Sequence, residues 1–286
     1  MDKAVSGKLQ SAMEYLMTYG WAMLAIAIVM VSLYSLGIFN AGSLQPTAAT
    51  GACKVIRTAA LTSLAGQCNG LIPRYVARFR GSNNWVQVPN SATLNITNNN
   101  ITVAAWVYPV NSVNYMRIAT KTYTGAWALN FQTNTYVVNF DLGKGGVSSG
   151  SVLSANSLRQ NRWSFVVGTY NGCALSIYIN GTLDNAATCY SNDLGTDTDP
   201  VYIGYEGGSP MNGSIANVQV YNTSLDPATI KAMYVEGIGG APINLKNLVG
   251  WWPLNGDAND YSGNNNHGTP TNVIWNANWQ SSYTQH

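Results

Sequence analysis

The chain has 286 residues, of which 9% carry a charge, and its formal net charge is +2 at pH 7. Lysine and arginine form no basic run, so the charge pattern gives no support to a nucleic-acid partner. Asn, Gly, Ser and Thr are abundant instead, which is typical of an exported surface rich in hydroxyl and amide groups and not of a cytosolic enzyme.

An apolar stretch near the N-terminus predicts a helix inserted in a membrane. Residues 15–39 carry no charge, and as an α-helix they would be about 38 Å long, against roughly 30 Å of bilayer hydrocarbon. The stretch is longer than the apolar region of a secretory signal peptide, which has about 7–15 residues. Glu14 stands directly before it, and a carboxylate at a membrane edge normally marks a partner.

The segment KLQSAMEYLMTYGWAML resembles the class III signal peptide of archaeal type IV pilin-like proteins. The family pattern of Gln, Ser, Glu and apolar residues is met by Gln10, Ser11, Glu14 and Leu16. Many members have Gly before the Gln, whereas this chain has Leu9, so the sequence departs from the family at the cut site.

This resemblance implies that a prepilin peptidase cuts between Leu9 and Gln10 and removes residues 1–9 as a leader. Residues 10–40 would remain as an assembly helix, with Glu14 fifth in the mature chain. The new α-amino group and this carboxylate can neutralise each other between neighbouring pilin subunits in a low-dielectric bundle. A single-span membrane anchor that never polymerises is the alternative.

Residues 41–74 are expected to form a linker and a cysteine-containing segment. The chain has an even number of cysteines, all after the apolar stretch, which in an extracellular context predicts two disulfides. Local pairing is favoured among three connectivities, and each loop would then contribute about 3 kcal/mol. The expected pairs are Cys53–Cys68 and Cys173–Cys189. A zinc site is the alternative, without any Cys-x-x-Cys to support it.

A hairpin turn at Asn180-Gly181 complicates the second pair. A two-residue turn would pair Ile179 with Thr182, and Cys173 would then face Thr188. Pairing with Cys189 therefore requires a one-residue bulge or a longer loop. Surface glycosylation is also expected, because five Asn-x-Ser/Thr sequons occur. They begin at Asn95, Asn100, Asn180, Asn212 and Asn222.

From Tyr75 onward the apolar residues recur with period two. Short segments rich in Val, Ile, Tyr, Trp and Thr alternate with Gly, Asn, Asp and Ser turns, which predicts a β-sandwich. One helix is expected in LDPATIKAMYVEG, with Asp226 as its N-cap, Pro227 at its first position and Gly237 at its end.

Several of these segments together resemble a laminin-G-like, concanavalin A-like jelly roll. The resemblance is carried, in order, by RYVARFRGSNNWVQVPNSATLNIT, ITVAAWVYP, RWSFVVGTYNGCALSIYINGTL and GSIANVQVYNTSLDPATIKAMY. It implies a mainly β fold, in which a jelly-roll domain over residues 75–286 follows the hydrophobic helix. The fold hosts lectins, adhesion modules and glycosidases alike, so it does not settle function.

The C-terminal segment LVGWWPLNGDANDYSGNNNHGTP resembles the opening strand of the same family, displaced to the end of the chain. We hypothesise a circular permutation in which residues 248–279 complete the sandwich begun at Tyr75. The alternative is that this strand pairs with a neighbouring subunit.

The loop from Asp257 to Asn264 concentrates carboxylate and amide oxygens, which suit calcium. We expect a structural calcium ion on Asp257, Asp260 and Asn264; an Asx-rich turn that bonds its own backbone is the alternative. A weaker case of the same kind is formed by Asp193, Asp197 and Asp199.

Aromatic side chains are the expected platforms for a sugar ligand, since 9 Trp and 17 Tyr occur in the chain. The candidates are Tyr115, Tyr123, Trp127 and Tyr136. No catalytic residue is predicted, because the Glu-x-Asp typical of glycosidases of this fold is missing. We therefore expect a pilin-like adhesion subunit on the cell surface whose jelly roll binds glycans; a non-polymerising surface lectin and a secreted carbohydrate-active enzyme are the alternatives.

Overall fold

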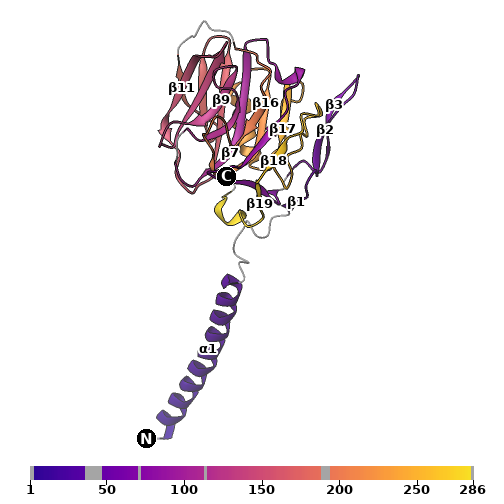
Figure 1. Ribbon diagram of the computed structural model, residues 1–286. Helices are drawn as coiled ribbons and strands as arrows, with labels where there is room; N and C mark the ends of the chain where they lie inside the picture. The colour runs from indigo at the N-terminus through magenta and orange to yellow at the C-terminus, as the bar shows by residue number, and fades with distance from the viewer. Residues whose placement is uncertain (1–2, 36–46, 70–71, 113–114, 188–193, 285–286) are drawn as a thin grey trace. The chain divides into compact units, whose positions relative to one another are not determined.

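The computed structural model describes residues 3–35, 47–69, 72–112, 115–187 and 194–284, and within residues 3–16 it describes the backbone only. The chain divides into two units, Met1–Gln45 and Pro46–His286, and each is considered by itself below. Among the residues that the structure describes, the first unit contains helix α1, and the second contains the β-sandwich with helix α3 (Figure 1).

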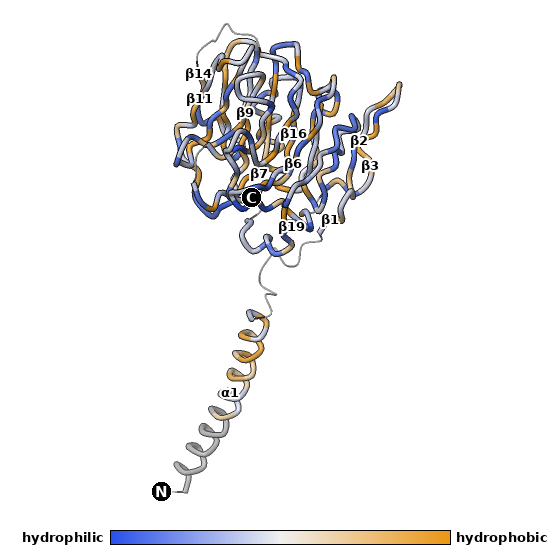
Figure 2. Tube along the Cα trace, viewed as in Figure 1, coloured by the Kyte–Doolittle hydropathy of each residue, from blue (hydrophilic) through white to orange (hydrophobic). Residues whose placement is uncertain are grey.

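Helix α1 (Lys3–Ser35) is the apolar segment expected from the sequence. Its stretch Met17–Ser35 is long and apolar enough to cross a membrane. The described side chains of this stretch are almost all exposed within the chain. Figure 2 shows that much of the stretch is hydrophobic. The helix begins earlier than residue 10, and the expected cut between Leu9 and Gln10 falls inside it.

Two sheets form the sandwich, which confirms the mainly β, jelly-roll fold class (Figure 1). One is seven-stranded in the order β11-β10-β9-β8-β15-β6-β18; the other has the order β14-β13-β12-β7-β16-β5-β19, with β17 also paired to β16. The strands of the first sheet are β6 (Trp85–Val88), β8 (Arg117–Lys121), β9 (Trp127–Phe131), β10 (Val137–Lys144), β11 (Val147–Ser157), β15 (Val201–Ile203) and β18 (Thr269–Thr271). Those of the second are β5 (Val76–Arg80), β7 (Asn100–Pro109), β12 (Ser164–Asn171), β13 (Leu175–Ile179), β14 (Thr182–Ala187), β16 (Asn212–Tyr221), β17 (Leu248–Trp252) and β19 (Ile274–Asn276).

The sandwich has apolar clusters on both faces of its second sheet, and β7 shows why. Side chains alternate across a strand: Val103 and Val107 enter the cluster between the sheets, while Trp106 enters a second cluster on the other face. Helix α3 (Pro227–Glu236) contributes Ile230 and Met233 to that second cluster. Its expected N-cap is present, since the Asp226 carboxylate accepts the Thr229 N–H at 2.9 Å.

The C-terminal strands pair within the same chain. Strand β17 pairs with β16, β18 with β6, and β19 with β5, all antiparallel. Trp252 of β17 is fully buried between the sheets, and its indole N–H donates to the Asn266 carbonyl at 2.9 Å. The segment 248–279 thus completes its own sandwich, as the permutation hypothesis expects.

Within residues 41–74, the expected linker and cysteine-containing segment, the described residues form β1 (Thr47–Ala48), β2 (Cys53–Arg57), β3 (Thr62–Gly66) and β4 (Ile72–Pro73), all within the second unit. Arg57 explains the attachment of the β2–β3 hairpin, because its guanidinium donates to the carbonyls of Ser262, Leu245 and Leu248 at 2.7–2.9 Å. The 3-10 turns η1 (Ala92–Leu94) and η2 (Gln280–Ser282) are the remaining elements of the described residues.

Candidate functional site

A polar hollow lies on the outer face of the seven-stranded sheet. On β9 and β10, Leu129 and Phe140 belong to the cluster between the sheets, so the alternate residues Asn130, Asn139 and Asp141 face the other way. The hollow has a volume of about 480 Å³, within the range typical of small-molecule sites. It is lined by Tyr115, Arg117, Tyr123, Gln132, Asn139, Asp141, Ser148, Ser151, Glu206, Gly207 and Ser209.

An ion pair between Arg117 and Glu206 forms the centre of this hollow. Arg117 Nε lies 3.1 Å from Glu206 Oε2, and both side chains are largely removed from water. Glu206 also accepts hydrogen bonds from the Thr120 hydroxyl at 3.1 Å and from the Tyr123 backbone N–H at 3.0 Å. A buried charge is stable only with such partners, and these contacts fix the loop after β15 against β8.

Asp141 is the second carboxylate of the hollow. Its Oδ2 accepts from the Asn139 amide at 2.8 Å, and in the amide orientation that its neighbours require, Asn130 donates to the same oxygen at 2.9 Å. The Asn130 carbonyl oxygen then accepts from Arg117 at 3.0 Å. Burial raises the pKa of Asp141 to about 6, although the Asn139 hydrogen bond and the Arg117 charge oppose this shift.

The rim of the hollow carries two of the predicted sugar platforms. Tyr115 and Tyr123 are each 42% exposed, and the Arg117 guanidinium lies 5.9 Å and 4.8 Å from their respective ring centroids. Below them, the Asn139 side-chain oxygen is buried and has no hydrogen-bond partner among the described residues. The hollow therefore combines exposed aromatic faces with a buried hydrogen-bond acceptor that has no partner among the described residues.

The other two predicted platforms lie elsewhere. Trp127 is 1% exposed and belongs to the cluster between the sheets, so its prediction as a platform is wrong. Tyr136 is half-buried, packs edge-on against Phe131 and does not line the hollow. Both residues follow the inward alternation of the sandwich, which aromatic composition alone does not reveal.

The sequence reasoning missed the charged residues of the hollow. A signal for Asp141 was present, since Asn139 and Asp141 are polar residues two apart in an apolar strand and must share a face. Arg117 and Glu206 gave no comparable signal, because they are 89 positions apart in the numbering and only the pairing of β8 with β15 brings them together.

The family model described as the concanavalin A-like lectin/glucanases superfamily matches residues 80–231, more than half of the chain. The chain belongs to this superfamily. The matched residues include all those that line the hollow of the concanavalin A-like domain. No curated protein matches the sequence.

Solved structures resemble this chain at low sequence identity. A "putative carbohydrate binding protein" from Bacteroides ovatus gives a TM-score of 0.57 at 17% identity, over 75% of this chain and 67% of that one. The binding domain of Paraclostridial mosquitocidal protein 1 gives 0.47 at 11%, over 68% of this chain and 48% of its own length. Domain 4 of AbnA, a GH43 extracellular arabinanase from Geobacillus stearothermophilus in complex with arabinotriose, gives 0.42 at 14%, over 64% and 81%. The similarity to the Bacteroides ovatus protein shows the fold alone.

The loop expected to hold calcium is closed by its own hydrogen bonds. Asp260 accepts from the backbone N–H groups of Trp251, Ser262 and Asn266 at 2.8–3.0 Å and from the Ser262 hydroxyl at 2.8 Å. Asn264 turns its amide nitrogen to two backbone carbonyls. Asp257 accepts from the Tyr261 hydroxyl at 2.7 Å. These bonds account for the loop without a metal, and calcium binding there stays a prediction.

The ammonium group of Lys121 lies among the oxygen atoms of the weaker calcium candidate. The ammonium of Lys121, which is 1% exposed, donates to Asn90 Oδ1 and to the Asp199 carbonyl at 2.7 Å and lies 3.5 Å from Asp197. This ammonium supplies the positive charge that these oxygens require. Asp193 lies outside the described residues.

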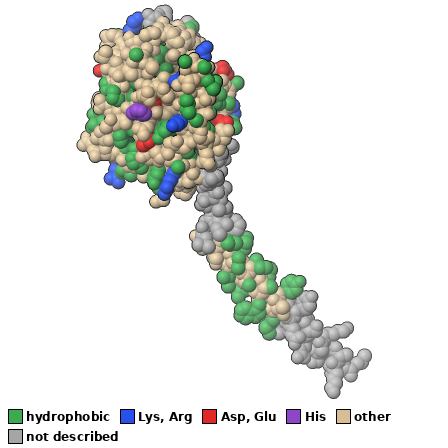
Figure 3. All heavy atoms as spheres, turned by 90° about the vertical axis from the view of Figure 1, so that its right-hand side faces the viewer, with side chains coloured by type: hydrophobic (Ala, Val, Ile, Leu, Met, Phe, Trp, Pro, Cys, Tyr) green, Lys and Arg blue, Asp and Glu red, His purple; other side chains and the backbone are tan. Residues whose placement is uncertain are grey.

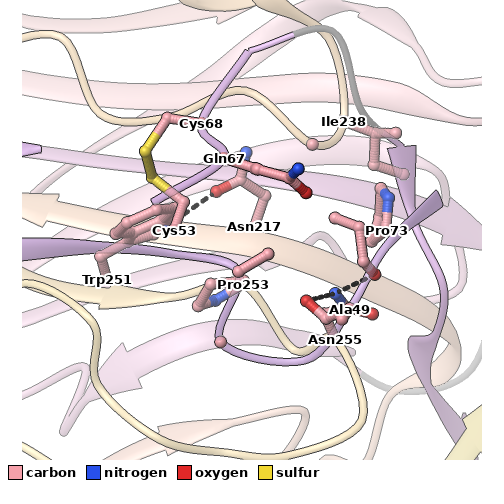
Figure 4. Close-up of a pocket in the computed structure, with 14 residues that line it drawn as sticks. Ala49, Cys53, Gln67, Cys68, Pro73, Asn217, Ile238, Trp251, Pro253 and Asn255 are labelled. Carbon is pink, nitrogen blue, oxygen red and sulfur yellow. Dashed lines mark hydrogen bonds between the residues drawn. A yellow bond between two sulfur atoms is a disulfide. The ribbon is translucent and has the colours of Figure 1, made fainter. Parts of the chain in front are cut away.

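The first cysteine pair is present as a disulfide between Cys53 and Cys68, with the Cα atoms 4.9 Å apart. Figure 4 shows it beside Trp251 and Asn217, at a cavity of about 40 Å³. A cavity of that volume has room for about one water molecule. We therefore place the candidate site in the larger hollow and regard this pocket as part of the packing around the disulfide.

The second hairpin has the bulge that the expected disulfide requires. Ile179 pairs with Thr182, but the register shifts by one residue between Ile177 and Tyr178, so that Ile177 pairs with Asn185. Cys173 is disulfide-bonded, and its expected partner, Cys189, lies outside the described residues.

The remaining predicted sites are not tested by the structure. The side chain of Glu14 lies outside the described side chains. All five sequon asparagines are half-buried, and their glycosylation stays a prediction; they are Asn95, Asn100, Asn180, Asn212 and Asn222.

We predict that Asp141 makes the folded domain less stable as the pH rises from about 4 to about 6. Its pKa is raised from 3.8 to about 6, so the folded state binds more protons than the unfolded state in that window. The contribution is at most roughly 3 kcal/mol. Urea unfolding of wild type and Asp141→Asn at several pH values measures it, because the variant lacks this titration. Parallel pH profiles for the two proteins would contradict the assignment.

Proposed function

We propose that this chain is a cell-surface adhesion protein whose concanavalin A-like domain binds a glycan in the hollow between Tyr115 and Glu206. The observation that carries the proposal is the combination of two exposed tyrosines with a buried polar floor in which Arg117 is paired with Glu206. Sugar rings present apolar faces and hydroxyl edges, and such a site offers partners for both. The Bacteroides ovatus protein of the same fold, with its carbohydrate-binding description, supports this choice of ligand class.

The floor of the first hollow offers hydrogen-bond acceptors to the hydroxyl groups of a sugar. Asn139 Oδ1 has no partner among the described residues, and Asp141 lines the hollow. A ligand hydroxyl that donates to Asn139 Oδ1 would satisfy a buried group whose isolation costs about 1–3 kcal/mol. Arg117 is already committed to Glu206 and is partly covered by the tyrosines. The hollow therefore suits a neutral glycan.

The two carboxylates favour binding over catalysis. Both oxygens of Glu206 accept hydrogen bonds, one from the Tyr123 N–H and the other from the Thr120 hydroxyl, with Arg117 alongside. A catalytic nucleophile or base needs a free oxygen directed at the substrate. Glu206 is thus a structural member of the hollow, and Asp141 alone does not form the pair that glycoside hydrolysis uses.

Helix α1 would hold the domain at the cell surface. Its stretch Met17–Ser35 can cross a membrane by length and composition, and the domain surface is poor in charge, as Figure 3 shows for one face. The pilin-type resemblance around Gln10 adds a finer proposal, in which a prepilin peptidase releases the helix for assembly with other pilin subunits in an extracellular filament. Glu14 would then neutralise the new N-terminus of a neighbour.

We predict that Tyr123→Ala lowers the affinity for neutral oligosaccharides at least tenfold. The substitution removes an exposed aromatic face and leaves the Glu206–backbone hydrogen bond in place; loss of about 1.4 kcal/mol corresponds to this factor. A glycan array followed by calorimetry on the full chain measures the change.

Tyr34→Ala is the matched control, because Tyr34 is exposed on α1 in the other unit. Equal affinities for wild type and Tyr123→Ala would exclude the hollow as the glycan site. Release of reducing sugar by wild type and not by Asp141→Asn would replace the binding proposal with the enzymatic alternative.

We predict that Glu14→Ala abolishes filament assembly while the domain still reaches the surface. The substitution removes the carboxylate proposed to pair between subunits, and Glu14→Gln serves as the variant that keeps its size. Electron microscopy of surface filaments, with mass spectrometry of the mature N-terminus, measures assembly and cleavage together. Normal surface display of a protein that never forms filaments, in wild type and variant alike, would support the single-span anchor instead.

A further inference from the structure

A second hollow lies where the loop between β11 and β12 meets the β13–β14 hairpin and helix α3. Its volume is about 330 Å³, again within the range of small-molecule sites. The lining residues are Ser157, Leu158, Arg159, Arg162, Trp163, Ser164, Ile179, Asn180 and Tyr234. None of them lines the first hollow.

The charge of this second hollow is positive and uncompensated. Arg159 and Arg162 line it together, and no Asp or Glu does. Neither arginine forms a salt bridge with any of the described residues; the pairs found there are Arg117–Glu206 and Lys121–Asp197. Lys231 adds a third cation at the edge, with its ammonium 5.0 Å from the Tyr234 ring centroid. Because the formal net charge of the whole chain is only +2, these three cations form a local concentration of positive charge.

The two arginines are carried by a loop that is tied down between them. The Gln160 side-chain amide donates to the Val110 carbonyl, and the Asn161 backbone N–H donates to the Pro109 carbonyl at 2.8 Å. Arg159 and Arg162 are therefore held on one short, anchored segment in spite of their mutual repulsion. Such an arrangement is stabilised by an anion between or beside the guanidinium groups.

The opposite walls of the second hollow are aromatic and fixed. Tyr234 stacks on Trp106 with ring centroids 5.8 Å apart. The Trp163 indole N–H donates to the Ser282 hydroxyl at 3.2 Å. Asn180 Oδ1 accepts from the Phe165 N–H at 2.9 Å, which leaves the amide NH₂ of Asn180 as a donor at the hollow. Rings at the wall and donors at the edge suit a sugar that carries a charge.

We propose that this second hollow binds the carboxylate or sulfate group of an acidic saccharide. The planar guanidinium groups of Arg159 and Arg162 match such an oxyanion bidentately, and the saccharide ring would lie against Tyr234 and Trp163. The first hollow offers the opposite surroundings, because its one cation is neutralised by Glu206. The domain would thus bind neutral and acidic sugars at separate places, and the second site does not depend on the first.

The test measures affinity with charged and uncharged forms of the same sugar. The full chain, in nanodiscs of zwitterionic lipid, is titrated with tri-galacturonate and its methyl ester, and with a sulfated galactose oligosaccharide and its desulfated form. The protein is made in a bacterial host without N-glycosylation, because a glycan on Asn180 would occupy the same hollow. The two pairs of probes distinguish a carboxylate from a sulfate ligand.

Wild type is expected to bind the charged member of at least one pair at least tenfold more tightly than the uncharged member. Arg159→Gln/Arg162→Gln should remove this preference, and raising NaCl from about 50 to about 300 mM should weaken it, since salt screens exposed charges. Arg80→Gln, an exposed arginine outside both hollows, is the control and should change nothing.

Equal affinity for the charged and uncharged probes, or an unchanged preference in the double variant, would overturn the proposal. If the first hollow does not bind glycans, a different result is expected: Tyr123→Ala would bind neutral oligosaccharides with the same affinity as wild type. Because glutamine keeps most of the side-chain volume and both arginines are exposed, folding of the double variant is expected to match that of wild type by circular dichroism.

Discussion

The ion pair between Arg117 and Glu206 determines the shape of the first hollow. Each side chain is largely buried, and a charge so placed would cost several kcal/mol without its partner. Glu206 extends the contact to the Tyr123 backbone, and Arg117 extends it through Asn130 to Asp141. One pair of charges thus positions an aromatic rim residue, a buried carboxylate and the loop after β15, so the hollow exists before any ligand arrives.

The sandwich that carries this pair depends on its last strands. β17, β18 and β19 add to both sheets, and Arg57 joins the N-terminal hairpin to the same C-terminal region. Charge is scarce in the domain, and the two hollows differ in how it is arranged. Arg117 in the first hollow is paired with Glu206, whereas Arg159 and Arg162 in the second hollow have no salt-bridge partner among the described residues. We infer that this difference separates the ligands of the two hollows.

Much of the fold could be predicted from the sequence, because it rests on local patterns. Period-two alternation indicated the strands, Asp226 and Pro227 located α3, and the turn arithmetic at Asn180 anticipated the bulge in the hairpin. The site was only partly predictable. The aromatic character of Tyr115 and Tyr123 was enough to predict them as sugar platforms, and both are exposed. Trp127 was wrongly predicted as a platform, because its place in the alternation along β9 directs its side chain into the core. Arg117 and Glu206 meet through strand pairing between distant segments, which no local pattern contains.

Hydrogen–deuterium exchange of the full chain, with and without a saturating neutral oligosaccharide, tests whether the first hollow is the glycan site. Exchange is expected to be slower at the backbone N–H groups around Tyr123, along β10 and in the loop at Glu206, where the ligand and the ion pair share contacts. Slower exchange confined to other segments, or none at all with ligand bound, would contradict the assignment of the glycan site to this hollow.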